Sequence, residues 1–169
     1  MILKGIIDED FVNYKKPSMT LMFPHCTFKC GAELCQNSPL VSQEEYHIDS
    51  YDICKRYLLN DITEAIVCQG LEPFDSWFDL QEFIIAIRIH YYCFDDIVIY
   101  TGYEENEISD KIEYLSSFSN IIIKFGRYIP NQEKHFDEVL GVYLASDNQY
   151  AKALNTWRPK NEIFHYKKI

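Results

Sequence analysis

Ala65-Ile66-Val67-Cys68-Gln69-Gly70 is the stretch that decides the fold class of this chain. Its apolar run predicts a short buried strand, which ends where Gly70 and Pro73 break regular structure. From Asp75 or Ser76 to about Tyr92, apolar residues then recur at helical spacing. A buried strand followed directly by an amphipathic helix predicts one βα unit.

The same alternation continues on both sides of this unit. Further buried strands are predicted at 18–23, 97–100, 121–124 and 141–144, and helices at about 50–59 and 105–115. A short helical stretch is expected near 149–154, followed by a polar tail. Continuously apolar strands that alternate with helices are typical of a parallel α/β sheet. The length of 169 residues suits a single domain, so we expect one α/β domain over 1–169.

Composition narrows the function classes. The chain carries 26 acidic and 16 basic residues, a formal net charge of −10, which argues against general affinity for nucleic acid. No apolar run approaches the roughly 20 residues that cross a bilayer, and the first ten residues turn acidic where a signal peptide is apolar. We therefore expect a cytoplasmic protein without a membrane partner. In a reducing cytosol, clustered cysteines indicate metal or redox chemistry.

Three of the six cysteines cluster directly after the strand at 18–23. Cys26, Cys30 and Cys35 form a C-x3-C-x4-C pattern, whose thiolates can ligate three irons of a cubane 4Fe-4S cluster and leave the fourth iron open. The alternative is a structural zinc site completed by His25 or His47. The remaining cysteines lie within apolar patterns and are predicted to pack in the core: Cys54, Cys68 and Cys93.

Four segments, each at a predicted loop, carry a family resemblance. They are Phe23-Pro24-His25-Cys26 through Cys35-Gln36-Asn37, Gln69-Gly70-Leu71-Glu72-Pro73, Tyr100-Thr101-Gly102-Tyr103 and Ser146-Asp147-Asn148-Gln149. In this order they resemble the radical S-adenosylmethionine superfamily, and within it the activating proteins of anaerobic, class III ribonucleotide reductases. The chain differs in having two extra residues before its third cysteine, and Leu71 where the family has a second glycine.

The resemblance implies a fold, cofactors and partners. The fold would be a partial (βα) barrel of mostly parallel strands, holding a 4Fe-4S cluster on Cys26, Cys30 and Cys35 and S-adenosyl-L-methionine beside it. Gly70, Leu71 and Glu72 would hold the amino group of this cofactor, Thr101 would line the pocket, and Lys124 would contact its carboxylate or ribose.

The implied activity is that of an oxidoreductase. It cleaves the cofactor to methionine and a 5′-deoxyadenosyl radical, which abstracts hydrogen from a glycine of a partner protein. That partner would be an anaerobic ribonucleotide reductase, and a flavodoxin or ferredoxin would supply the electron.

Other functions stay open at the level of sequence. The same cofactor chemistry could act on another peptide or on a small molecule, or the chain could be a non-catalytic iron-sulfur or zinc binding module. Tyr100 and Tyr103 are expected to be packing residues, and Asn148-Gln149 could equally cap the helix expected at 149–154.

Overall fold

The computed structural model describes residues 1–155; the polar tail expected after Leu154 lies outside the described residues from position 156 onward. The core of the fold is a six-stranded sheet in the order β10-β7-β6-β5-β3-β2. Its four central strands are mutually parallel, and the edge strands β2 and β10 run antiparallel to their neighbours. Their bounds are β2 Gly5–Asp10, β3 Ser18–Phe23, β5 Ala65–Gly70, β6 Asp96–Tyr100, β7 Ile121–Phe125 and β10 Tyr150–Asn155.

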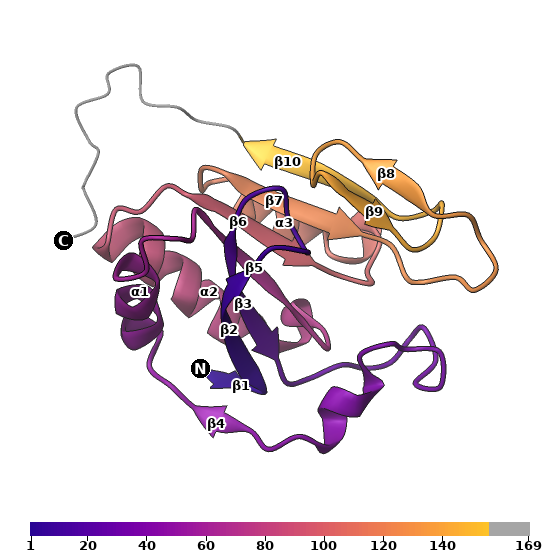
Figure 1. Ribbon diagram of the computed structural model, residues 1–169, viewed down its shortest axis with the longest axis horizontal. Coiled ribbons are helices and arrows are strands. Elements are labelled where there is room, and N and C mark those ends of the chain that lie inside the picture. Colours follow the sequence, from indigo (N-terminus) through magenta and orange to yellow (C-terminus); the bar gives the residue numbers. More distant parts are fainter. Residues whose placement is uncertain (156–169) are drawn as a thin grey trace.

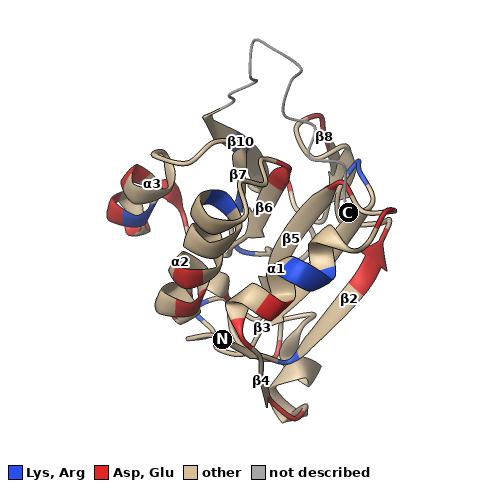
Figure 2. Ribbon diagram, turned by 90° about the vertical axis from the view of Figure 1, so that its left-hand side faces the viewer, with Lys and Arg blue, Asp and Glu red and all other residues tan. Residues whose placement is uncertain are grey.

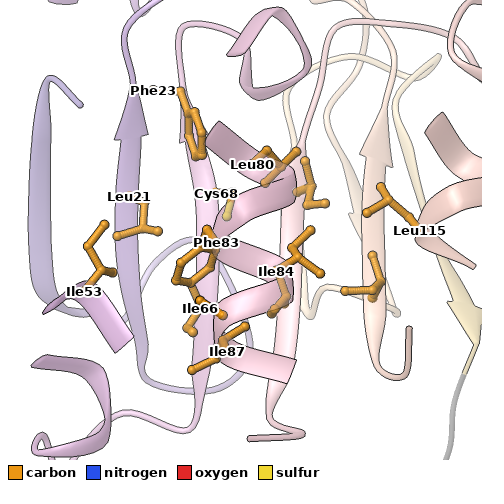
Figure 3. Packing of buried hydrophobic residues seen from close by; sticks show 14 of the residues in the cluster. Leu21, Phe23, Ile53, Ile66, Cys68, Leu80, Phe83, Ile84, Ile87 and Leu115 are labelled. Atoms are coloured by element: carbon orange, nitrogen blue, oxygen red, sulfur yellow. The ribbon is translucent and has the colours of Figure 1, made fainter. Parts of the chain in front are cut away.

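Helices cover one face of this sheet (Figure 1). They are α1 (Ser50–Leu58), α2 (Trp77–Ile85) with its continuation η3 (Ala86–His90), and α3 (Ser109–Leu115). Alternate strand residues point toward them, because successive side chains of a strand lie on opposite faces. Figure 3 shows Leu21 and Phe23 of β3 and Ile66 of β5 on the side of the sheet that faces Leu80 and Phe83 of α2, in the main core.

A second, smaller core lies on the opposite face of the sheet. Val67, Val98 and Ile122 of the sheet pack there against Tyr14 and Leu144. Tyr14 belongs to the loop that joins β2 to β3, and Leu144 to β9 (Val142–Leu144), which pairs antiparallel with β8 (His135–Asp137). This face is therefore filled near the amino ends of the strands.

Short elements complete the described chain. β1 (Ile2–Leu3) pairs with β4 (Tyr46–His47), and the single-turn helices are η1 (Ser38–Ser42), η2 (Pro73–Ser76) and η4 (Glu105–Glu107). Within residues 1–155 no helix is long and apolar enough to cross a membrane. Figure 2 shows acidic positions on α2, on α3 and at the end of β2, in keeping with the negative charge of the chain.

Most predicted elements are confirmed. The strands at 18–23, 65–69, 97–100 and 121–124 correspond to β3, β5, β6 and β7, and the parallel α/β sheet is present. The helix predicted to start at Asp49 or Ser50 is α1, and the Asp49 side chain caps it by accepting a hydrogen bond from the backbone N–H of Tyr51. The helix predicted at 105–115 is divided into η4 and α3.

Near the end of the described chain, one prediction is confirmed in part and one is wrong. The strand predicted at 141–144 is present as β9, but it pairs with β8 and does not join the main sheet. The expected helix at 149–154 is the edge strand β10, which takes up the free edge of β7. Ala151 and Ala153 of β10 pack on the smaller core, so tertiary pairing overrides the helix preference of these alanines.

The parallel arrangement determines where the site lies. Because β3, β5, β6 and β7 are parallel, their carboxyl ends lie at one edge of the sheet, here called the carboxyl edge. The residues that follow these strands come from positions about 100 apart in sequence, and the fold brings them together there. Ligand sites of open α/β sheets form at this edge.

Candidate functional site

A cavity of about 330 Å³ opens at the carboxyl edge of the sheet. All eight residues that sequence analysis assigned to metal or cofactor line it: Cys26, Cys30, Cys35, Gly70, Leu71, Glu72, Thr101 and Lys124. They come from the loops after β3, β5 and β6 and from β7 itself. Leu144 of the smaller core also lines the cavity, so the cavity directly adjoins this core.

The three thiols lie on the loop of residues 24–37, here called the cysteine loop. All three cysteines are free and partly exposed. The Sγ of Cys26 accepts a hydrogen bond from the backbone N–H of Phe28 at 3.2 Å, as sulfurs that ligate iron commonly do. Burial raises the pKa of the Cys26 thiol to about 11, and the charges of Glu72 and Asp75 add to the rise. Burial also raises the pKa of Cys30.

Tight turns shape this loop. Phe28 and Gly31 both have positive φ, at 51° and 88°, and the Gly31 N–H donates to the Phe28 carbonyl. Further along, the Cys35 N–H donates to the Ala32 carbonyl at 3.3 Å. The two residues added before Cys35 are thus absorbed by turns, and Cys35 still faces the cavity.

The thiols do not form a preset site for a single ion. Within residues 1–155 no three His, Cys, Asp or Glu side chains converge closely enough to hold one metal ion. His25 is exposed, and His47, in β4, is not among the residues that line the cavity. Neither histidine therefore completes a tetrahedral zinc site with the three thiols in this arrangement.

The turn after β5 requires glycine at one position. Gly70 has φ +107°, and a Cβ there would lie 2.7 Å from the Phe23 backbone nitrogen. The Gly70 carbonyl accepts a hydrogen bond from the Asn37 side-chain amide at 2.7 Å, which ties the end of the cysteine loop to this turn. Leu71 has no positive φ and is half-buried, so the leucine is accommodated without backbone strain.

Glu72 is buried at the centre of the site, 4% exposed. Its Oε1 accepts hydrogen bonds from the Thr101 hydroxyl at 2.8 Å and the Phe74 N–H at 3.1 Å, and its Oε2 accepts one from the Gly102 N–H at 2.9 Å. Burial raises the pKa of Glu72 to about 7 although these donors favour the charged form. Oε2 accepts only one of these bonds, so it retains acceptor capacity for a ligand.

Lys124 supplies the opposite charge from β7. It lies on the sheet face that carries Gln69 and Tyr100, both of which also line the cavity. Its ammonium donates to the Gly126 carbonyl at 2.9 Å. Burial lowers the pKa of Lys124 to about 8, while the charge of Glu72 opposes this shift. The cavity therefore combines a buried carboxylate with a buried ammonium.

Sequence analysis missed the residues that hold the rim of the cavity. Asp75 accepts hydrogen bonds from the Thr27 N–H and the Tyr103 hydroxyl, both at 2.7 Å. Arg127 and Lys29 both lie within ion-pair distance of Glu107, at 2.8 and 3.5 Å. The position of Asp75 shortly after Glu72-Pro73 could have indicated a role in the site. An acidic residue there is also typical of a helix start, which is how the sequence was interpreted.

The fourth resembling segment also meets the site. Gln149 donates to the Gly126 carbonyl, and Asn148 donates to the Arg127 carbonyl. Gln149 also lines the cavity. The alternative that these residues cap a helix is wrong, because a strand follows them, and they fix the loop that leaves β7.

The buried cysteines are confirmed as core residues. Cys54 and Cys68 are fully buried, and Cys93 is 9% exposed, all in the main core. Burial raises the pKa of Cys93 to about 11, which keeps its thiol neutral. These cysteines do not line the cavity.

No protein-family model, curated protein or solved structure matches this chain.

Proposed function

We propose that this chain is a 4Fe-4S radical S-adenosylmethionine enzyme of the glycyl-radical activating type. The observation that carries the proposal is that all eight residues assigned from sequence line one cavity. They include three thiols from one loop, a buried carboxylate and a buried ammonium. A parallel sheet brings the ends of its strands together, and the shared lining is what the resemblance leads one to expect there.

The donor set of three thiols suits a three-cysteine cluster. A cubane presents three separate irons to three thiolates, so its ligands need not converge on one point. The thiols of Cys26, Cys30 and Cys35 all face one cavity. The pKa values of Cys26 and Cys30 are raised, so these two thiols would release protons on cluster assembly, as thiols do when they bind metal.

Glu72 and Lys124 match an amino acid zwitterion. The carboxylate of Glu72 would accept hydrogen bonds from an ammonium group, and the ammonium of Lys124 would donate to a carboxylate. Both side chains are buried, where charge-assisted hydrogen bonds are stronger than in water. The methionine moiety of S-adenosylmethionine carries both groups. When bound, cluster and cofactor together supply a 5′-deoxyadenosyl radical, and the chain supplies binding and orientation.

A protein substrate suits the size of the site. A cavity of about 330 Å³ leaves little room for a third molecule once a cluster and a cofactor are inside. A glycine-bearing segment of a partner, in the manner of an anaerobic ribonucleotide reductase, would instead reach the site from outside. The proposal includes a flavodoxin or ferredoxin-type reductant, a cytoplasmic location, and a partial barrel of the radical S-adenosylmethionine type as the finer description of the sheet.

The first test is the metal content of anaerobically reconstituted protein. We expect about four irons per chain and an electron paramagnetic resonance signal, in the reduced state, that changes when S-adenosylmethionine is added. Cys26→Ala, Cys30→Ala and Cys35→Ala should each abolish that change, whereas Cys54→Ala, in the core, should retain it. Zinc without iron in the reconstituted wild type would overturn the proposal.

A further inference from the structure

One carboxylate joins three loops at the rim of the cavity. Asp75 lies in η2 and is half-buried. Its Oδ2 accepts a hydrogen bond from the backbone N–H of Thr27 at 2.7 Å, and its Oδ1 accepts one from the Tyr103 hydroxyl at 2.7 Å. That hydroxyl also lies 3.4 Å from the Thr27 Oγ1. Thr27 is the residue after Cys26, so this bond acts next to the first thiol.

The contacts of the cysteine loop with the rest of the chain concentrate at its two ends. At the start, Thr27 binds Asp75 and the His25 carbonyl accepts from the Glu72 N–H at 2.7 Å. At the end, Asn37 binds the Gly70 carbonyl. Between these points the loop is closed by its own turns, and Lys29 pairs with Glu107. The bond between Thr27 and Asp75 is the side-chain contact nearest to Cys26.

Tyr103 is itself held in place. The Lys29 ammonium lies 4.8 Å from the centre of its ring, and the Arg127 guanidinium 5.6 Å. Both cations also pair with Glu107. Burial raises the pKa of Tyr103 to about 12, with the charge of Asp75 contributing, so the hydroxyl keeps the proton that it donates. Asp75 therefore receives two donors that come from well-anchored loops.

We propose that Asp75 is the positioning residue of the cysteine loop, holding its first turn so that the Cys26 thiol faces the cavity beside Glu72. Asp75 does not line that cavity, so it acts through Thr27 and Tyr103 rather than on a ligand. The identity of the group held by the thiols rests on the proposed function. The ordering of the loop does not, because it concerns the protein without metal.

The first experiment measures amide hydrogen exchange in the metal-free protein. Asp75→Ala removes both bonds, so the amide of Thr27 should exchange at least about tenfold faster, as expected when a hydrogen bond to a charged acceptor is lost. Asp75→Asn can accept from the Thr27 N–H and donate to the Tyr103 hydroxyl, so it should restore the rate to within about twofold.

Asp79→Ala is the matched control. Asp79 lies one helical turn further along, is also half-buried, and accepts a backbone N–H, that of Ile2 at 2.9 Å. Its loss should leave exchange at Thr27 unchanged. Equal exchange at Thr27 in Asp75→Ala and in wild type would overturn the inference.

The second experiment uses reconstituted protein and separates this inference from the proposed function. In Asp75→Ala the electron paramagnetic resonance signal should broaden, and a chelator should remove iron about tenfold faster than from Asp79→Ala. If wild type takes up no cluster, the proposed function fails while the exchange result still decides the role of Asp75. If Asp75→Ala does not fold, Tyr103→Phe decides instead: exchange at Thr27 about threefold faster supports the inference, and unchanged exchange contradicts it.

Discussion

At the scale of single residues, the site depends on one position that only glycine fits and on two buried charged groups. Gly70 approaches the backbone of Phe23 too closely for any side chain, and its own carbonyl holds Asn37. Glu72 and Lys124 are buried charged groups that face one cavity. Burying such groups is costly unless they are partnered, which makes this cavity the candidate functional site.

Replacing Gly70 tests the turn directly. In Gly70→Ala the Cβ would lie 2.7 Å and 2.9 Å from backbone atoms of Phe23, at a φ of +107° that alanine rarely adopts. We expect a loss of about 2 kcal/mol or more in the free energy of unfolding, measured by urea denaturation. Gly5→Ala is the control, because its Cβ would meet only the flexible end of Met22, and it should cost less than about 1 kcal/mol. Equal losses in the two variants would contradict this account of the turn.

The pKa values of Glu72 and Lys124 predict how the affinity for the proposed cofactor depends on pH. Glu72, with a pKa of about 7, is charged above that pH, and Lys124, with a pKa of about 8, is charged below it. Affinity for S-adenosylmethionine should therefore be highest between about pH 7 and 8 and fall on both sides, as measured by titration calorimetry on the reconstituted protein. In Glu72→Gln the acid limb should disappear. An affinity independent of pH in wild type would show that these groups do not hold the zwitterion.

At the scale of elements, sequence periodicity predicted the strands and helices that depend on local sequence. The four parallel strands and α1 follow from apolar runs and from the Asp49 cap, both of which act over a few residues. The strand β10 could not be predicted this way, because its partner β7 lies about 30 residues away and its alanines favour helix in isolation. The same holds for the β8–β9 hairpin, which is stabilised by the smaller core.

The residues of the candidate site also fall into those that local sequence predicts and those that depend on distant partners. Its cysteines, Glu72 and Thr101 lie in recognisable motifs, so their shared cavity was an expected consequence of a parallel sheet. Asp75, Lys29 and Arg127 were missed, because each acts through a partner on another loop. Such pairings depend on loop geometry, which local sequence does not determine.

The π-helical segment η3 carries a buried charged residue, Arg88. Ala86–His90 places Arg88 in the interior, 3% exposed, where it donates to the carbonyls of Cys93, Asp95 and Ser119. Arg88→Met would leave these carbonyls without the guanidinium. We expect a loss of about 3 kcal/mol or more in the free energy of unfolding. Lys55→Met, which breaks only an exposed pair with Asp52, should leave it nearly unchanged. Comparable losses in urea denaturation would contradict the role of Arg88.

At the scale of the whole molecule, the fold places the candidate site at the carboxyl edge of the sheet and the hydrophobic cores on its two faces. Helices fill one face of the sheet, and the smaller core fills the amino-terminal part of the other. The cavity occupies what remains, at the carboxyl edge. Acidic positions lie on α2, on α3 and at the end of β2, among other places (Figure 2). In residues 1–155 the candidate site therefore lies at the carboxyl edge of the sheet.

Formation of 5′-deoxyadenosine by the reduced, reconstituted protein under anaerobic conditions tests the central claim most directly. The account predicts that wild type forms this product from S-adenosylmethionine, and that Cys30→Ala and Glu72→Gln lower the yield at least about tenfold while Cys54→Ala does not. A protein that holds a full iron-sulfur cluster and binds S-adenosylmethionine, yet forms no 5′-deoxyadenosine, would contradict it and leave a non-catalytic binding module.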